Sequence, residues 1–447
     1  MKTPLPSLGA HIEIEIDAMD DEGRGRALLN DNDSEPIDIA IRGAFVGDRV
    51  TGIVEKIFAQ RRLVICRVEH VLEEGPCRVP RTCPHNAPCP TCPLHGADAS
   101  LAFEVKKGRI ERALDDAGID LSIDDLIPHP HEHGYRQKVK WMVGGRPGKL
   151  VLGVYVPYSH HLVASQQCPY INPEIVKAAK PLMKVLNSIS LERMEEFGVK
   201  ALIMRACVEG VTAILITENL FSDADFEALS ALVEQKILLS VIERHQEEST
   251  NSILGGEVVR SYGPTQIVSL EGKLVEVDSF CQTDPEQAQR MYDDVAEYLI
   301  HDGTDGWFVD GYAGVGGFSK SLLENGAQNI LAVEQSVSAG SSLSALGVEF
   351  MLKPMSQALE RVSSLKPLVG MVLDPAKKGL MEDAAWLAML KVPRVVLVSC
   401  DPDAMAKDLK VFLTAGYAVE RIVPLDLFGG APAIETLVFM KQNSNAL

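Results

Sequence analysis

The 447-residue sequence predicts an α/β protein in three parts: a β-barrel over residues 1–72, a central α+β domain over 73–282 and a doubly covered parallel sheet over 283–447. Three observations lead to this fold class. Short strand-like runs joined by close turns fill residues 10–70, and proline and cysteine crowd residues 75–95. In the last part, apolar runs alternate with helical stretches, which is typical of a parallel sheet with helices on both faces.

The composition is that of a soluble globular protein, with 46% hydrophobic and 23% charged residues. No apolar stretch approaches the roughly 18 residues that a membrane span requires, and the N-terminus lacks the apolar core of a signal peptide. We therefore expect a cytoplasmic monomer with no membrane partner. The net charge of −19 argues against a nucleic-acid-binding protein unless positive charge is concentrated locally.

The N-terminal part begins with HIEIEID at residues 11–17, turns at DDEGRG and continues through IDIAI, TGIVEKIF and RRLVICRVEHVL. Short strands with close turns between them favour a small barrel. Acidic residues outnumber basic ones in this part, so it is not an obvious surface for a polyanion. A plain β-domain with no ligand is the alternative.

The central part opens with GPCRVPRTCPHNAPCPTCPLH, in which frequent proline prevents regular structure. Something other than backbone pairing must therefore order this segment. Cys83, Cys89 and Cys92 form a C-x5-C-x2-C pattern, and Cys168 is a candidate fourth thiolate. Four thiolates bind either an iron–sulfur cluster or a zinc ion, and the spacing does not separate the two.

A helix is expected over residues 98–117, in a position to pack on the C-terminal domain, and further helices over 172–188 and 224–236. The segment GYRQKVKWMVGGRPGKLVLG, residues 134–153, holds five basic residues and no acidic one. On a strand, Arg136, Lys138 and Lys140 share one face. Such a basic stripe suits phosphate contacts with RNA, and a solvated edge strand is the alternative.

A glycine-rich turn, WFVDGYAGVGGFSKSLL, joins the first strand of the last part to its helix. Glycines let a ligand approach the backbone, and Glu334 ends the next strand, where a carboxylate accepts hydrogen bonds from ribose hydroxyls. A nicotinamide cofactor would suit such a loop equally well. The D-x-x-x-G-x-G form of the turn and the extra strand pair AVERIVPLD and ETLVFM favour the S-adenosylmethionine-dependent methyltransferase version of this architecture.

The stretch RVVLVSCDPDAMAKDL runs from a buried strand into Cys400 and then into an Asp-Pro helix start. A free cysteine often packs as a small core residue. At the carboxyl edge of a parallel sheet, where ligands bind, the same thiol is available as a nucleophile. We favour the nucleophile.

These residues together resemble the RNA 5-methyluridine methyltransferase family, most of all its bacterial 23S ribosomal RNA members, over nearly the whole chain. The barrel, with GRG at 23–25 and FVGDRV at 45–50, is similar to a TRAM domain. The other matches are Tyr135-Arg136 with Lys138, Phe280-Cys281-Gln282 with Asp284, DPAKKG at 374–379, Ser399-Cys400-Asp401-Pro402, and Glu435 beyond them.

The resemblance implies methylation of carbon 5 of a flipped-out uridine in RNA, in 23S ribosomal RNA or in transfer RNA, with S-adenosylmethionine as donor. It implies that Cys400 is the nucleophile that adds to carbon 6 and that Glu435 is the general base. It implies a class I, Rossmann-like domain with seven strands over residues 283–447. The donor contacts that it implies are Gln282, Tyr312, Gly317, Glu334 and Asp374, and the implied ligands of a [4Fe-4S] cluster are Cys83, Cys89, Cys92 and Cys168.

Several positions depart from the family pattern. Asp401 replaces the asparagine of S-C-N-P, Ala313 replaces the cysteine of the glycine loop, and DLFGGAPAIE lacks the Thr and His that precede the catalytic glutamate. These changes bear on the RNA target and on donor affinity. Three alternatives stay open: the same chemistry on transfer RNA, a non-catalytic RNA-binding iron–sulfur protein, and a redox or structural metalloprotein.

Overall fold

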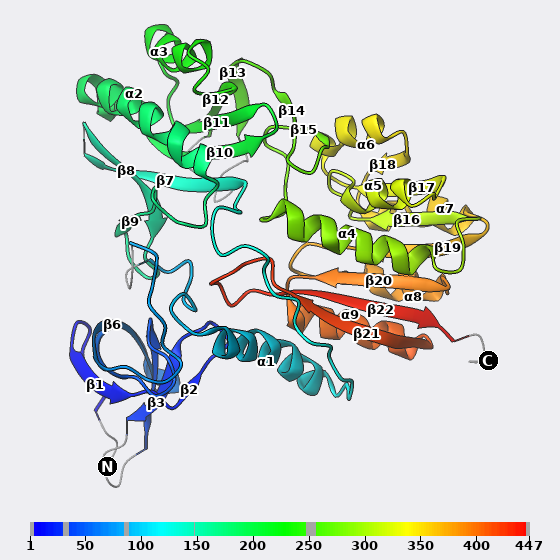
Figure 1. Cartoon of the computed structure of the whole chain (residues 1–447), viewed down its shortest axis with the longest axis horizontal. Coiled ribbons are helices and arrows are strands. Elements are labelled where there is room, and N and C mark those ends of the chain that lie inside the picture. Colours follow the sequence, from blue (N-terminus) through cyan, green and yellow to red (C-terminus); the bar gives the residue numbers. More distant parts are fainter. Residues whose placement is uncertain (1–3, 30–34, 85–88, 147, 247–255, 444–447) are drawn as a thin grey trace. The chain divides into compact units, whose positions relative to one another are not determined.

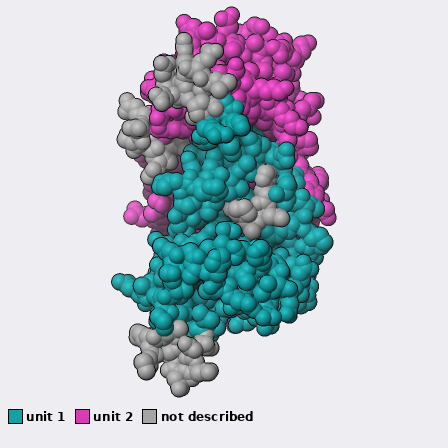
Figure 2. Space-filling view, turned by 90° about the vertical axis from the view of Figure 1, so that its left-hand side faces the viewer, with its two compact units in different colours: residues 1–109, 141–169, 428–432 teal, residues 110–140, 170–427, 433–447 magenta. Residues whose placement is uncertain are grey.

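The computed structural model of the chain describes residues 4–29, 35–84, 89–146, 148–246 and 256–443, with the backbone alone over 190–197 (Figure 1). Within these ranges no helix has both the length and the apolar character to cross a lipid bilayer. The chain divides into two compact units (Figure 2). Unit 1 holds residues 1–109, 141–169 and 428–432, and unit 2 holds 110–140, 170–427 and 433–447. The predicted three-domain division stays a prediction.

The N-terminal residues of unit 1 form one six-stranded sheet in the order β1-β5-β6-β4-β3-β2. The neighbouring strands pair antiparallel except β4 and β6, which are parallel. Alternating β-branched residues such as Ile37, Ile39 and Ile41 are fully buried and form the core of this sheet. The elements are β1 (His11–Glu15), β2 (Ala18–Met19), β3 (Gly25–Leu29), β4 (Ile37–Arg42), β5 (Arg49–Phe58), the 3₁₀ helix η1 (Ala59–Arg61) and β6 (Leu63–Glu73).

The rest of unit 1 is built from a helix and a small antiparallel group of strands. Strand β8 (Lys149–Tyr155) pairs with β7 (Lys138–Arg146) and with β9 (Leu162–Ala164). Helix α1 (Ala99–Ala117) begins in unit 1, where Leu101 and Val105 pack in a small cluster with Phe45 and Leu94. Its last turns belong to unit 2, where Ile110, Ala113 and Leu114 join the core of the C-terminal sheet.

Unit 2 contains a second sheet whose strands in this unit follow the order β13-β12-β11-β10. Side-chain caps start both of its helices: Asn172 accepts from the Glu174 N–H, and Ser222 from the Asp225 N–H. Strands β10 and β11 are almost wholly buried. The elements are α2 (Pro173–Phe197), β10 (Val199–Cys207), β11 (Gly210–Thr217), α3 (Asp223–Glu234), β12 (Ser240–His245), β13 (Glu257–Tyr262), and the hairpin β14 (Gln266–Val268) with β15 (Leu274–Glu276).

The C-terminal sheet of unit 2 has seven strands in the order β18-β17-β16-β19-β20-β22-β21 (Figure 1). The first five pair in parallel, and β22 lies antiparallel between β20 and β21. The alternation of strands and helices along this part of the chain confirms the predicted α/β class. The strands are β16 (Trp307–Gly311), β17 (Asn329–Glu334), β18 (Glu349–Leu352), β19 (Leu368–Leu373), β20 (Arg394–Ser399), β21 (Tyr417–Leu425) and β22 (Glu435–Gln442).

Helices lie on both faces of this sheet. On β19, Gly370 faces Leu299 of helix α4, whereas its neighbour Met371 belongs to the core shared with α8 and α9. Successive residues of a strand point to opposite faces, so α4 and the α8–α9 pair lie on opposite sides. The helices are α4 (Pro285–Ile300), α5 (Gly317–Glu324), η2 (Val337–Ala339), α6 (Gly340–Leu346), η3 (Met355–Gln357), α7 (Leu359–Ser364), α8 (Asp383–Met389) and α9 (Pro402–Thr414).

Candidate functional site

The predicted site residues of the last domain meet at one edge of the C-terminal sheet. Strands β16, β19 and β20 are parallel neighbours, so their carboxyl ends lie side by side. The Asp374 N–H donates to the Gly311 carbonyl (3.2 Å), which joins the ends of β19 and β16. Cys400 directly follows β20. This is the edge at which ligands bind in open α/β sheets.

Cys400 and Glu435 face each other across two neighbouring strands. The antiparallel register pairs Ser399 with Thr436, so the next pair outward is Cys400 with Glu435. The Glu435 side chain is buried (4% exposed), and the Cys400 side chain is partly buried. The sequence separates these residues by 35 positions, and the strand pairing brings them together.

Burial favours the neutral forms of both groups. Burial, with smaller contributions from the nearby Glu435 and Asp374 carboxyls, raises the pKa of the Cys400 thiol to about 11. Burial also raises the pKa of Glu435 well above its ordinary value, with Asp374 contributing. A protonated thiol is a poor nucleophile, so in this resting form Cys400 would need a lower pKa before it could react.

Asp401 fixes the position of Cys400 from the other side. Its carboxylate accepts from the Ala404 N–H (3.1 Å) and caps helix α9. The Ser399 hydroxyl accepts from the Asp401 N–H (3.2 Å) and donates to the Asp401 carbonyl (3.0 Å), so hydrogen bonds close around Cys400 on both sides. Asparagine and aspartate cap helices about equally well, so Asp401 keeps the role that an asparagine would have here.

The glycine loop between β16 and α5 is held by two carboxylates. Asp310 accepts from the Ser319 N–H (2.9 Å) and hydroxyl (2.6 Å), and this contact ties the strand end to the helix start. Glu334 accepts from the Gly314 N–H (2.9 Å) and from the Ser336 N–H (2.7 Å). The predicted ribose-binding carboxylate therefore also shapes the loop that a ligand would contact.

Two predicted donor-binding residues have structural partners inside the protein. A Cβ at Gly317 would lie 2.4 Å from the Tyr292 ring, so close packing requires glycine there. Tyr312 has a left-handed backbone (φ +63°), and its hydroxyl donates to Asp383 (2.9 Å). The hydroxyl hydrogen of Tyr312 is therefore used inside the protein, so a ligand would contact its ring, its backbone or the hydroxyl oxygen as an acceptor.

Four carboxyl groups gather at this edge: Asp310, Glu334, Asp374 and Glu435. Burial, with smaller contributions from Asp310 and Glu334, raises the pKa of Asp374 to about 7. Burial raises the pKa of Asp310 to about 6, opposed by its hydrogen bonds from Ser319. The buried Oδ1 atom of Asp310 has no hydrogen-bond partner in the part of the chain that the structure describes. This concentration of acid favours a cationic ligand, and a sulfonium donor fits that requirement.

Gln282 lies on a segment that buried cations hold in place. Its backbone carbonyl accepts from the Gln137 side chain (3.0 Å). The Lys138 ammonium donates to the carbonyls of Asp278 (3.1 Å) and Ser279 (2.8 Å), and burial lowers the pKa of this lysine. Lys138 therefore does not belong to an exposed basic stripe as predicted. Its ammonium donates hydrogen bonds inside the protein and supports the segment that leads to Gln282.

The loop that precedes Glu435 in the chain is held by two further basic residues. Neither of them was predicted from the sequence. Within unit 1, the buried Lys106 ammonium donates to the Gly429 carbonyl (2.6 Å) and the Arg109 guanidinium to the Pro432 carbonyl (2.7 Å). Both come from helix α1, which lies more than 300 positions away in the sequence. A basic residue on an amphipathic helix normally indicates a solvated face, so no sequence signal marked these contacts.

The four predicted metal ligands do not form a metal site as the structure stands. Cys83, Cys89, Cys92 and Cys168 all belong to unit 1 and are partly exposed. Among the described residues, no group of three or more His, Cys, Asp or Glu side chains is placed to hold a metal ion. Residues 85–88, between the first two cysteines, lie outside the described ranges. The predicted cluster therefore stays a prediction.

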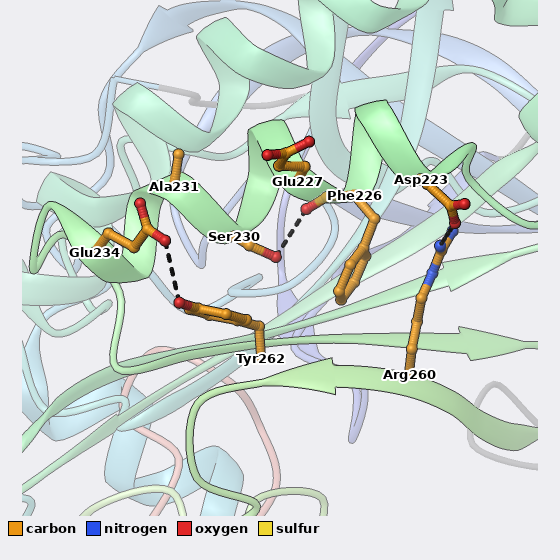
Figure 3. Close-up of a pocket in the computed structure, with 8 residues that line it drawn as sticks. All are labelled: Asp223, Phe226, Glu227, Ser230, Ala231, Glu234, Arg260 and Tyr262. Atoms are coloured by element: carbon orange, nitrogen blue, oxygen red, sulfur yellow. Dashed lines mark hydrogen bonds and ion pairs between the residues drawn. The ribbon is translucent and has the colours of Figure 1, made fainter.

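A cleft of about 450 Å³ lies elsewhere in unit 2, between helix α3 and strand β13 (Figure 3). Arg260 donates to Asp223 (3.0 Å) and Tyr262 to Glu234 (3.1 Å), so these pairs tie the edge strand to the helix. None of the predicted site residues lines this cleft. Its paired charges indicate a structural role.

Comparisons with known proteins agree on the fold over nearly the whole chain. No protein-family model matches it. An uncharacterized RNA methyltransferase of Clostridium tetani is 25% identical over 98% of each chain, and one of Caldanaerobacter subterraneus is 24% identical over 97% of this chain and 99% of that protein. The crystal structure of a Pyrococcus abyssi tRNA (uracil-54, C5)-methyltransferase with S-adenosyl-L-homocysteine is similar with a TM-score of 0.73 and 19% identity, covering 96% of this chain and all of the other.

Proposed function

We propose that this chain is an S-adenosylmethionine-dependent RNA methyltransferase that methylates carbon 5 of a uridine. One observation carries the proposal: the strand register places Cys400 opposite Glu435 at the ligand-binding edge of the sheet, beside Asp374. The names of relatives from Clostridium tetani and other bacteria support an RNA substrate, and the name of the similar Pyrococcus abyssi structure supports uracil C5 chemistry.

Carbon 5 of uracil is a weak nucleophile, so the ring needs covalent activation. In the proposed mechanism, the Cys400 thiol first gives its proton to solvent, the thiolate sulfur bonds to carbon 6, and the electron pair of the C5–C6 double bond moves to carbon 5 and the adjacent carbonyl. S-adenosylmethionine supplies the electrophilic methyl group that carbon 5 takes. Glu435, in its carboxylate form after releasing its own proton to solvent, then removes the proton from carbon 5, and the electron pair re-forms the double bond and expels the Cys400 thiolate.

The acidic edge supplies the donor site in this proposal. Glu334 ends β17 and Asp374 directly follows β19, the two strands that flank β16, and Asp374 also lies near both reacting groups. Glu334 accepts hydrogen bonds from the ribose hydroxyls of the methyl donor, and Asp374 faces the positive charge on the sulfur of that donor. Gln282, Tyr312 and Gly317 complete the proposed set, with Gly317 acting through the close packing of helix α5.

The RNA target is proposed as 23S ribosomal RNA, in line with the sequence resemblance, and transfer RNA is the second candidate. The TM-score of 0.73 to a structure named a tRNA methyltransferase favours the second candidate. A non-catalytic RNA-binding protein would have no reason to place a thiol opposite a buried carboxyl. The juxtaposition of Cys400 and Glu435 therefore favours an enzyme.

The test is methyl transfer from labelled S-adenosylmethionine to unmodified ribosomal and transfer RNA, followed by nucleoside analysis. Wild type, Cys400→Ala and Glu435→Gln are compared after anaerobic purification. We expect label in 5-methyluridine with wild type and none with Cys400→Ala. Glu435→Gln is expected to retain a covalent protein–RNA adduct that survives denaturation, because the C5 proton stays in place. Transfer of label to neither RNA by folded wild-type protein would refute the proposal.

A further inference from the structure

A second cleft lies in unit 1, and none of its lining residues is assigned a role in the reaction. It has a volume of about 490 Å³, which is within the range of about 300–1,000 Å³ that is usual for small-ligand sites. Strands β5 and β6 form one wall through Glu55 and Arg67, and the turn between β8 and β9 forms the other. The lining residues are Glu55, Arg67, Val156, Pro157, Tyr158, Ser159 and His161.

The turn over residues 156–161 is a rigid support for one aromatic ring. The Val156 N–H donates to the His161 carbonyl (2.9 Å), and the Ser159 N–H donates back to the Val156 carbonyl (3.2 Å). The Ser159 hydroxyl donates to the same carbonyl (3.0 Å) and accepts from the His161 N–H (3.2 Å). These bonds hold Tyr158 at the rim of the cleft with 58% of its surface exposed.

Tyr158 occupies a backbone conformation that would suit glycine better. Its φ is +63°, in the left-handed region where a side chain other than glycine or asparagine is strained. A turn of this shape needs no aromatic residue for its own stability. Strain that persists at an exposed large ring points to a use for the ring.

The surroundings of Tyr158 combine aromatic faces with positive charge. The Phe58 ring meets it edge to face at 6.4 Å, and the Lys56 amine lies 5.9 Å from its centroid. Arg67 and Arg42 both bond the Glu55 carboxylate, which is thereby neutralised. The charged lining residues Arg67 and Glu55 therefore offset each other, and Lys56 adds a positive charge beside the Tyr158 ring in a chain whose net charge is −19.

We propose that this cleft binds an unstacked nucleobase of the RNA substrate on the Tyr158 ring, with Lys56 holding the adjacent phosphate. The proposal rests on the proposed RNA methyltransferase function and extends it to a site outside the reaction centre. Aromatic rings beside cationic side chains are the means by which proteins grip single-stranded nucleic acid, because every base has a face that stacks. A base paired in a duplex is not available to such a ring.

The experiment measures binding of a fluorescein-labelled oligouridine and of a perfectly paired RNA duplex to the full chain by fluorescence anisotropy. Tyr158→Gly removes the ring and relieves the backbone strain, so the variant is expected to fold at least as well as wild type. We expect it to weaken oligouridine binding by about 5- to 150-fold, which corresponds to about 1–3 kcal/mol for one stacked base, and to leave duplex binding unchanged. Tyr158→Phe, which keeps the ring, should bind like wild type.

Two matched variants separate stacking from charge. Tyr262→Ala removes an exposed tyrosine of the other cleft, where 41% of the residue is exposed, and should leave oligouridine binding unchanged. Lys56→Gln should reduce the slope of log affinity against log salt by about 0.7, the value for one phosphate contact on a single strand.

Unchanged oligouridine affinity in Tyr158→Gly would overturn the proposal, and so would an equal loss on oligouridine and duplex. If wild type methylates RNA and Tyr158→Gly binds oligouridine like wild type, the cleft is wrong and the enzymatic function stands. If wild type neither binds RNA nor transfers methyl groups to it, the proposed function fails and this site fails with it.

Discussion

The resting state of the Cys400 thiol leads to a quantitative prediction. Burial raises its pKa from 9.0 to about 11, with Glu435 and Asp374 contributing. At pH 8, a thiol with this pKa is ionised in about one molecule in a thousand, against about one in ten for a pKa of 9.0. Because the thiolate is the reactive form, iodoacetamide should alkylate Cys400 about 100-fold more slowly in the folded, ligand-free chain than in the unfolded chain.

The assay is pulsed alkylation between about pH 7 and about pH 10, followed by mass spectrometry of the peptide that contains Cys400. Cys66, whose pKa burial raises to about 12, serves as an internal reference that should react even more slowly. Glu435→Gln should accelerate alkylation by less than about tenfold, because burial is the larger cause. A wild-type rate at pH 8 equal to that of the unfolded chain would refute this reasoning, since it would require a preformed thiolate.

Four other predictions concern the support of the site. Gly317→Ala should destabilise the chain by about 1–3 kcal/mol in urea unfolding, because its Cβ would lie 2.4 Å from an aromatic ring. The control is Gly108→Ala in helix α1, whose Cβ would meet nothing within 4 Å and should not destabilise the chain. Equal effects of the two substitutions would contradict the packing argument. The folded Asp374 carboxyl has a pKa of about 7 and holds its proton where the unfolded one has lost it, so wild-type stability should fall between about pH 4 and pH 7 by up to about 1.4 kcal/mol per pH unit. Asp374→Asn should lack this contribution to the slope. Parallel curves of stability against pH for wild type and variant would exclude the prediction. Asp401→Ala should cost about 0.5–2 kcal/mol through the lost helix cap and Asp401→Asn almost nothing, which thermal unfolding distinguishes. Anaerobically purified protein should contain iron and sulfide in equal amounts; stoichiometric zinc or no metal would exclude the predicted cluster.

The strands of the C-terminal sheet were predictable because burial on both faces leaves a strong signal. The run at 395–400 is wholly apolar or small, and the structure has β20 over Arg394–Ser399. Asp284 and Pro285 mark a helix start by capping chemistry alone, and α4 begins there. Such signals are local. The parallel pairing of β4 with β6 and the inclusion of residues 428–432 in unit 1 depend on contacts between distant segments, which leave no local pattern.

The site was predictable in its members but not in their partners. The Cys400–Glu435 pair follows from strand register once two separate motifs have been recognised. In contrast, the Tyr312 hydroxyl bonds Asp383, and the Lys138 ammonium bonds backbone carbonyls. A side chain of several rotatable bonds can reach many partners, so its sequence position does not determine which partner it finds.

The charge of the sheet edge also bears on when the thiol can react. After burial, which is the largest cause, Glu435 and Asp374 raise the pKa of Cys400, so a positive charge that offsets these carboxyls should lower that pKa. The sulfonium of S-adenosylmethionine carries such a charge at sulfur. The sulfide product of methyl transfer differs only in having lost the methyl group and, with it, the positive charge. Alkylation of Cys400 should therefore be faster with S-adenosylmethionine bound than with S-adenosylhomocysteine bound. In the proposed mechanism, Cys400 would therefore attack a uridine most readily when a methyl group is present to be transferred, and it would return to its protonated, unreactive form once the methyl group has left the sulfur.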